Sequence, residues 1–461
     1  MNINISLSSD KYISEIIFFE KNIQQNFNSK FNLRVFIDEV YDENTYNLNY
    51  VYSHNINNPC RVLSLESAYE IIDNHTHIID SNLFKSDLRL STGHISSKHM
   101  ILKQASLTSL IFSQVSKNDF LTFSFGGSNI IHSILFKISY INNVFTYRIH
   151  NAINLESGFK SNRLWFSPNN IMLLSQDQPL FSHNKLAINK KVNFYIDNLI
   201  SGIKRDTLSK QFVSRRYPNS VKLVFNEFWK FSFLFLCGNK KYKIYFSRFK
   251  LLINSFFVLS LHSNIKTINK PYIFFALNVP TDSQILVRAP YFRDFISLIS
   301  IISDSIPLNH FLVIREHPAF PGMLNYFELR SLLNKKRNIK LISHKISFIN
   351  ILKNAKSLLI INNTSFLEAN LMKIPIISLG KGVFSNQNIT NEVIDFGDLS
   401  RVFINPSNVA SIEDLKLFLS RWYLETYPVD NSDSEKINSK IDLVLNGILE
   451  KIKLHLNFVS K

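Results

Sequence analysis

The sequence is poor in residues that interrupt or cross-link a chain. It has 11 Gly, 13 Pro and 2 Cys among 461 residues. So little Gly and Pro, together with an apolar fraction of 45%, excludes a disordered or collagen-like chain. The length suffices for two domains with full cores. Cys60 and Cys237 are too few for a disulfide framework and predict a reducing compartment.

Long apolar runs and several catalytic motifs are also missing from the sequence. No apolar run approaches the roughly 18 residues of a transmembrane helix, and residues 1–20 lack the pattern of a secretory signal. The absence of HExxH and CxxC predicts no protein-held metal. GxxxxGK[ST] and GxSxG are absent, which argues against a P-loop kinase and a hydrolase. We expect a cytoplasmic protein, or one peripheral at the inner face of the cytoplasmic membrane, without a cofactor.

Acidic residues are outnumbered, 35 against 52 Lys and Arg, which gives a net charge of +17. Much of the excess lies in Ser201–Lys250, where 12 basic residues accompany two acidic ones and many aromatic ones. Such a segment suits docking on anionic lipid headgroups, binding of nucleic acid, or a solvated helical face. No nucleic-acid-binding motif accompanies it, so we expect no nucleic-acid partner.

Two short apolar runs, Ser357–Ile361 and Ile374–Gly380, flank a polar turn. Their length and composition predict parallel neighbouring strands in an α/β sheet. Between them, Asn363 or Thr364 can cap a helix whose free amides bind an anion, with Glu368 on its first turn. This pattern suits the phosphate and ribose of a sugar nucleotide. An ordinary capped helix with a surface Glu is the alternative.

A third buried strand is predicted at Phe311–Arg315, and it runs into Glu316, His317 and Pro318. Proline ends the strand and fixes the loop. His317 is therefore predicted at the carboxyl end of its strand, on the sheet edge where open α/β folds place ligands.

The N-terminal half repeats the combination of strand, turn and helix. Asp119–Phe125 is predicted to be a strand, Gly126 and Gly127 a turn, and Ile130 the start of an apolar helix. In a first Rossmann-like domain, these glycines would let a ligand approach the backbone.

Four blocks follow one another in the C-terminal two thirds of the chain. They are Glu156–Phe159 with Ser167–Asn170, then Phe275–Gln284, then His317 and Pro318, then Asn362–Glu368 with Lys373, Pro375, Leu379 and Gly380. Together they resemble the blocks of the capsular polysaccharide synthesis family, which includes bacterial Kdo transferases. The likeness extends from about Phe123 to Phe384. Ser167, Asn278 and Phe366 depart from the Asp, Gln and Gly of the family pattern.

The resemblance implies a GT-B fold: α/β, with two Rossmann-like domains facing a cleft and a C-terminal helix crossing back. We expect an acceptor-side domain over 1–262, which includes the basic aromatic segment 201–250. A linker over 263–271, a nucleotide-sugar-binding domain over 272–425 and a terminal helix over 430–461 complete the expected organisation.

The resemblance also implies the site. The predicted nucleotide-sugar-binding residues are Asp282, His317, Pro318, Asn362, Asn363, Thr364 and Glu368, with the donor phosphate on His317 and the turn and the ribose on Glu368. CMP-Kdo is the leading donor. Because Ser167 cannot act as a carboxylate base, we predict that Glu156 activates the acceptor hydroxyl, with His150 and Asp119 as weaker candidates.

The function predicted on this basis is a glycosyltransferase of capsule or other surface polysaccharide synthesis, with a glycan or lipid-linked acceptor. Two alternatives stay open: a GT-B-like sugar-nucleotide epimerase or glycerophosphotransferase, and a non-catalytic assembly or export protein.

Overall fold

The chain forms two compact units in the computed structural model. Unit 1 comprises Met1–Leu90, Ile95–Ile188 and Arg421–Lys461, and unit 2 comprises Ser91–His94 and Asn189–Ser420. The structure describes residues 2–7, 20–21, 23, 31–37, 51–53, 64–75, 97–125, 129–151, 164–167, 185–205, 221–238, 242–318, 320–406, 409–427 and 447–453.

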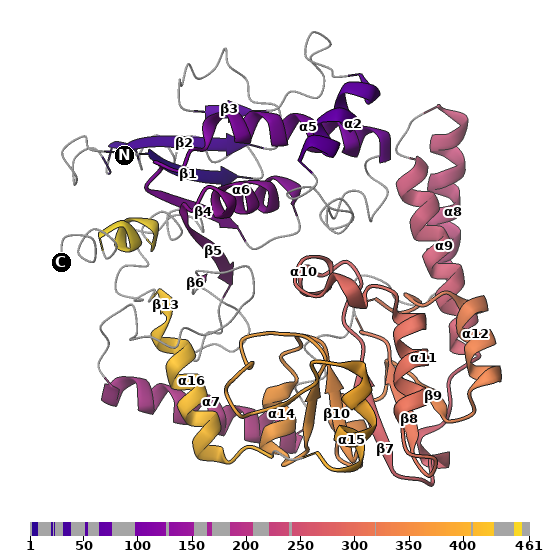
Figure 1. Cartoon of the computed structure of the whole chain (residues 1–461). Helices are drawn as coiled ribbons and strands as arrows, with labels where there is room; N and C mark the ends of the chain where they lie inside the picture. The colour runs from indigo at the N-terminus through magenta and orange to yellow at the C-terminus, as the bar shows by residue number, and fades with distance from the viewer. Residues whose placement is uncertain are drawn as a thin grey trace. The chain divides into compact units, whose positions relative to one another are not determined.

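Unit 1 is built on a seven-stranded sheet of order β3-β2-β1-β4-β5-β6-β13 (Figure 1). The strands are β1 (Asn2–Leu7), β2 (Asn32–Ile37), β3 (Val51–Ser53), β4 (Leu121–Phe125), β5 (Phe145–Asn151), β6 (Leu164–Ser167) and β13 (Thr426–Tyr427). β1 to β5 pair in parallel, whereas β6 pairs antiparallel with both β5 and β13. The accompanying helices are α2 (Leu65–Asn74), α5 (Ser97–Gln114) and α6 (Ile130–Ile141).

The predicted strand and helix around the N-terminal glycines are present as β4 and α6. α6 starts at Ile130 because Asn129 caps it, its side-chain oxygen accepting a hydrogen bond from the backbone N–H of Ile131 at 3.3 Å. Gly126 and Gly127 themselves lie outside the described residues.

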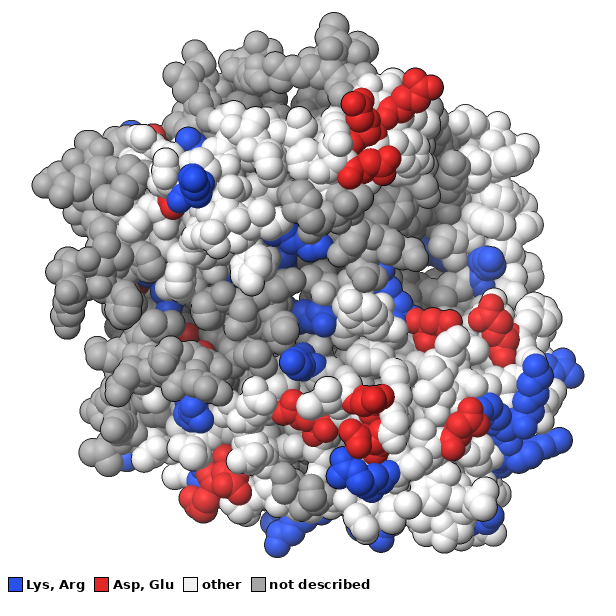
Figure 2. Space-filling view, viewed as in Figure 1, with Lys and Arg blue, Asp and Glu red and all other residues white. Residues whose placement is uncertain are grey.

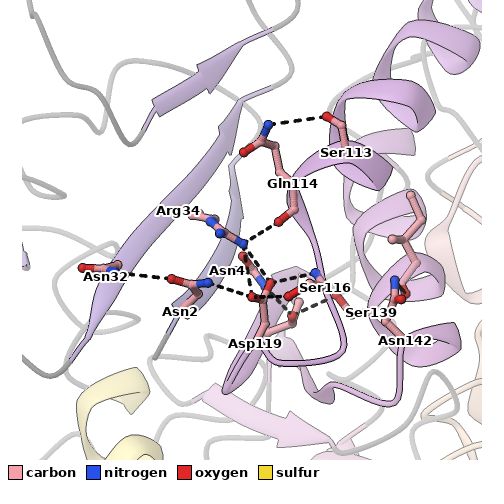
Figure 3. A network of polar contacts seen from close by, with 12 residues as sticks. Asn2, Asn4, Asn32, Arg34, Ser113, Gln114, Ser116, Asp119, Ser139 and Asn142 are labelled. Atoms are coloured by element: carbon pink, nitrogen blue, oxygen red, sulfur yellow. Dashed lines mark hydrogen bonds and ion pairs between the residues drawn. The ribbon is translucent and has the colours of Figure 1, made fainter.

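A polar network around Asp119 holds the amino-terminal edge of this sheet together (Figure 3). The Asp119 carboxylate accepts hydrogen bonds from Asn2 and Asn4 in β1, both at 2.9 Å. It also forms an ion pair of 3.0 Å with Arg34 in β2 and accepts from the backbone N–H of Ser116. Parallel sheets bind ligands at the opposite edge, so we assign Asp119 a structural role. The weaker prediction that it activates an acceptor is wrong.

Unit 2 contains a six-stranded, all-parallel sheet of order β12-β11-β10-β7-β8-β9. The strands are β7 (Tyr272–Ala276), β8 (Phe311–Arg315), β9 (Ile339–Ile342), β10 (Ser357–Ile360), β11 (Ile376–Ser378) and β12 (Asn391–Glu392). The helices are α7 (Lys185–Arg205), α8 (Val221–Leu236), α9 (Tyr242–Leu259), α10 (Ser283–Leu286), α11 (Phe295–Ser305), α12 (Tyr326–Lys335), α13 (Phe348–Leu352), α14 (Phe366–Leu371), α15 (Leu399–Ile404) and α16 (Ile412–Leu424).

Both sheets have the strand order of a Rossmann fold, which runs 3-2-1-4-5 in unit 1 and 3-2-1-4-5-6 in unit 2. All residues of β7 and β10 are buried, which explains why these strands are continuous apolar runs. The predicted α/β class with two Rossmann-like units is confirmed. No helix within the described ranges is long and apolar enough to cross a membrane.

The boundary between the units differs from the predicted linker at 263–271, because unit 2 includes residues from Asn189 onward. Asn254 of α9 shows why the helices α8 and α9 do not join unit 1. Its side-chain amide donates to the backbone oxygens of Gly322 at 2.7 Å and Leu324 at 2.6 Å, and its oxygen accepts from the Tyr326 N–H at 2.9 Å. These long-range bonds tie α9 to the start of α12.

The C-terminal segment returns to unit 1, as predicted. β13 pairs with β6, and residues 447–453 are helical. Lys451 is fully buried there, with its ammonium 5.3 Å from the centre of the Tyr147 ring. Burial lowers the pKa of Lys451 to about 7, and Glu425 opposes the shift.

Candidate functional site

The carboxyl-terminal edge of the unit 2 sheet contains the predicted nucleotide-site residues. Because β7, β8 and β10 are parallel, the loops that follow them leave from the same edge. β7 lies next to β10, yet the chain proceeds from β7 to β8 on the other side before it returns to β10. The strand order therefore reverses between β7 and β10. Open α/β sheets bind their ligands at such a switch point.

Two buried asparagines stand at this switch point, and each has a side-chain polar atom without a hydrogen-bond partner among the described residues. Asn278 follows β7 and is 6% exposed, while Asn362 follows β10 and is 8% exposed. Within the described part of the chain, the Asn278 side-chain oxygen and both polar atoms of the Asn362 amide have no hydrogen-bond partner. A buried polar atom left unsatisfied costs about 1–3 kcal/mol. Such atoms are usually satisfied by a ligand or water, so this pair marks a polar binding site.

Two glycines after β11 keep the space beside Asn362 open. A Cβ atom added at Gly380 would lie 3.1 Å from the Asn362 side-chain oxygen, and one at Gly382 would lie 3.0 Å from it. Asn362 also has a positive φ of 44°, a conformation that Asn tolerates better than most residues. The backbone and the glycines thus fix the direction in which this amide points.

The loop after β8 is held by Glu316. Its buried carboxylate accepts hydrogen bonds from the backbone N–H groups of Gly322 at 3.0 Å and Leu324 at 3.1 Å. Burial raises the pKa of Glu316, although these bonds oppose the shift. Glu316 therefore shapes the segment that contains His317 and Pro318, and the turn continues with a bond from the Phe320 N–H to the His317 oxygen at 2.8 Å.

His317 lies in a charged environment at the end of β8. Burial lowers its pKa, as does the nearby Arg315, while Asp282 raises it. The same Asp282 raises the pKa of Arg288, which burial lowers to about 10. The structure thus brings the two predicted residues Asp282 and His317 within electrostatic reach of each other. With its pKa lowered, His317 is mainly neutral at pH 7 and can donate one hydrogen bond to a phosphate.

A pair of imidazoles, those of His262 and His344, lies near the end of β9. The backbone oxygen of His344 accepts a hydrogen bond of 2.9 Å from Arg315, and the His344 ring centre lies 6.4 Å from that of His262. Burial lowers the pKa of both rings to about 4, so they are neutral at pH 7. Over the residues with described positions, no three His, Cys, Asp or Glu side chains form a group that could hold a metal ion.

The turn before α14 differs in detail from the prediction. The N-cap residue is Ser365, not Asn363 or Thr364, and its side chain forms no capping bond. Asn363 instead accepts a hydrogen bond from the Ser365 N–H at 3.0 Å within the turn, and Thr364 is exposed. The helix therefore starts at Phe366, directly after Ser365.

Glu368 lies on the first turn of α14, as predicted, but its side chain is buried. Burial raises the pKa of Glu368 to about 7. The pKa of Tyr195 in α7 is also raised, first by the burial of Tyr195 and second by the charge of Glu368. The Tyr195 hydroxyl and one Glu368 carboxylate oxygen have no hydrogen-bond partner among the residues described. A carboxyl group with this pKa can change its charge near neutral pH.

The predicted unit 1 residues are less well defined. Glu156 lies outside the described residues. His150 lies in β5 opposite Trp165 of β6, and Ser167 ends β6 opposite Arg148. The catalytic roles of Glu156 and His150 therefore stay predictions.

Residues 242–394 match the model of a protein family described as "Capsule polysaccharide biosynthesis protein". The predicted family resemblance is confirmed over these residues, whereas its first block, at Glu156–Phe159 and Ser167–Asn170, lies outside the match. This capsule-synthesis segment, residues 242–394, starts at the first residue of α9 and includes every switch-point residue from Asn278 to Gly382. Its start agrees with the hydrogen bonds that join α9 to the start of α12 in unit 2.

The curated proteins and solved structures give weaker likenesses. Protein FixF of Sinorhizobium fredii is 25% identical over 134 residues, which are 28% of this chain and 31% of FixF. The match thus spans about a third of that relative. The β-Kdo 2,7 transferase of Thermosulfurimonas dismutans KpsC has a TM-score of 0.35 and 12% identity, with coverage of 96% of this chain and 99% of that one. Anabaena HepE in complex with UDP and glucose has a TM-score of 0.29 and 10% identity, with coverage of 98% and 99%.

Several residues of the site were not predicted as binding residues from the sequence. Asn278 entered only as a departure from the family pattern, and Gly382 and Arg288 were not considered. The closely spaced glycines Gly380 and Gly382, directly after a predicted strand, were the available signal, because glycine often marks a close approach to the backbone. No sequence signal connects Tyr195 with Glu368.

Proposed function

We propose that this protein is a glycosyltransferase of capsule or other surface polysaccharide synthesis. It takes a sugar from a nucleotide donor and transfers it to a glycan or lipid-linked acceptor. The observation that carries the proposal is the pair Asn278 and Asn362 at the switch point of a Rossmann-type sheet. Within the described residues, the buried Asn278 side-chain oxygen and both polar atoms of the Asn362 amide lack hydrogen-bond partners. The match to the capsule-synthesis family over the same residues supports the pathway.

In this proposal the donor lies along the edge from β8 to β10. Neutral His317 and the turn at Asn362 hydrogen-bond the phosphate, and the ionised form of Glu368 accepts hydrogen bonds from the ribose hydroxyls. The cationic groups of Arg288 and Arg315 favour a negatively charged ligand nearby. CMP-Kdo is the donor to test first, on the basis of the sequence resemblance.

The transfer forms a bond between the acceptor oxygen and the anomeric carbon, and breaks the bond from that carbon to the donor phosphate. The acceptor proton passes to a base, for which Glu156 is the proposed group. The nucleotide leaves with the electron pair of the broken bond on its phosphate oxygen. The hydrogen-bond donors of the phosphate site lower the barrier to transfer because they stabilise the negative charge on that phosphate oxygen.

The test is release of nucleotide from CMP-Kdo and from UDP-sugars, with and without a capsule oligosaccharide acceptor. We expect acceptor-dependent release that falls in Asn362→Ala and is retained in Gly397→Ala, where an added Cβ would make ordinary van der Waals contacts, the shortest at 3.7 Å to Asp395 Oδ1. Conversion of one sugar nucleotide into another without release would replace the proposal with an epimerase. Nucleotide binding without turnover of any donor would replace it with a non-catalytic role.

A further inference from the structure

Helix α8 exposes an unusual row of apolar side chains. Phe225, Trp229, Phe233 and Leu236 follow one another at intervals of four, four and three residues, which places them on one face of the helix. Their exposed fractions are 60%, 69%, 66% and 83%. We call these four residues the aromatic stripe. Contiguous exposed apolar surface of this kind marks an interaction site.

The packing of the α8–α9 hairpin does not use the aromatic stripe. A different set of rings joins the two helices. The ring centre of Phe231 lies 5.1 Å from that of Phe246 and 6.3 Å from that of Tyr242, and the ring centres of Phe228 and Phe249 are 5.2 Å apart. α9 in turn packs on α12, where the ring centres of Phe257 and Tyr326 are 5.4 Å apart. The hairpin is thus anchored to unit 2 by side chains other than the four exposed ones of the stripe.

The charge around the stripe defines its partner. Between Thr207 and Thr281 the only acidic residue is Glu227, against 12 Lys and Arg. Glu227 is buried and lies 3.8 Å from the Lys230 ammonium, so it adds little negative surface. Arg248 and Lys250 on α9 are exposed. In the view of Figure 2, acidic side chains gather over α2, whereas the upper part of the hairpin is largely uncharged with some Lys and Arg.

We propose that the α8–α9 hairpin docks on an anionic phospholipid bilayer. The aromatic stripe enters the interface between headgroups and acyl chains, and the exposed Lys230, Arg248 and Lys250 of the hairpin contact the lipid phosphates. Charge argues against a second copy of the chain as the partner, because two such hairpins would bring like charges together. This docking does not depend on the proposed enzymatic activity.

Flotation of the full chain with vesicles tests the proposal. We expect binding to phosphatidylglycerol–phosphatidylcholine vesicles, little binding to phosphatidylcholine alone, and a steep loss in 0.5 M salt. Each Lys or Arg near an anionic surface contributes about fivefold to the partition coefficient. The double reversal Arg248→Glu/Lys250→Glu should therefore lower it by at least about 25-fold, whereas Lys335→Glu/Arg337→Glu, reversed at exposed positions on and after α12, should not.

The stripe has its own variant and control. Trp229→Ser/Phe233→Ser should abolish flotation, whereas Phe327→Ser, at a 77% exposed ring on α12, should leave it unchanged. Circular dichroism and nucleotide affinity of the variants confirm that they fold. Flotation of the stripe variant equal to wild type would overturn the proposal. The proposal would also be overturned if wild type were a dimer and the stripe variant lost both the dimer and vesicle binding. Charge-dependent binding of wild type to RNA without binding to vesicles would overturn it as well.

Discussion

Glu368 should make the stability of unit 2 depend on pH in a direction opposite to that of an ion-paired carboxylate. Burial raises its pKa from the ordinary 4.5 to about 7. Below pH 4.5 the group is protonated in both the folded and the unfolded chain, and it has no effect. Between 4.5 and 7 the unfolded chain releases the proton and the folded chain keeps it, so stability falls as pH rises. Above 7 the cost levels off at roughly 3 kcal/mol.

The perturbation that isolates this effect is Glu368→Gln, which keeps the shape of the side chain and removes the titration. Between pH 5 and pH 8 the free energy of unfolding of the variant should rise by about 2–3 kcal/mol relative to wild type. Urea unfolding at both pH values, followed by circular dichroism, measures the difference. Glu413→Gln, at a side chain that is 81% exposed, is the matched control and should show almost no pH-dependent difference. If the two free energies of unfolding keep the same separation at both pH values, the reasoning about Glu368 is refuted.

Three further predictions concern the nucleotide and the reaction. His317→Ala should weaken binding of CMP or UDP by about 1–3 kcal/mol in calorimetry, because a hydrogen bond to phosphate is lost; unchanged affinity would remove His317 from the site. Gly380→Ala should also weaken nucleotide binding, because the added Cβ would lie only 3.1 Å from the side-chain oxygen of Asn362. Gly397→Ala should bind nucleotide as wild type does. Glu156→Gln should lower turnover by about 10² to 10⁴ with little change in nucleotide affinity, and turnover within a few-fold of wild type would reject Glu156 as the base.

The strands of unit 2 could be predicted because each is buried on both faces. The predicted strand Phe311–Arg315 has the same bounds as β8, and Ser357–Ile361 differs from β10 by one residue. Proline after β8 and glycine after β11 then marked where the loops begin. Since parallel strands share one carboxyl edge, the approximate location of the site followed from these bounds.

Other features depend on contacts that no local pattern reveals. The cap of α14 could not be chosen among Asn363, Thr364 and Ser365, because all three are good capping residues. The unit boundary depends on bonds from Asn254 to residues about seventy positions away.

The most direct test of the central claim is calorimetric titration of CMP and UDP into wild type, Asn278→Ala and Asn362→Ala. The control is Asn309→Ala, an exposed position just before β8, at the opposite edge of the sheet. If the nucleotide occupies the switch point between β7 and β10, wild type binds at least one of CMP and UDP. Each switch-point variant then binds that nucleotide more weakly by about 1–3 kcal/mol, or about 5- to 150-fold, whereas the control binds it as wild type does. Equal affinity in all four proteins, or binding of neither nucleotide to wild type, would contradict the account.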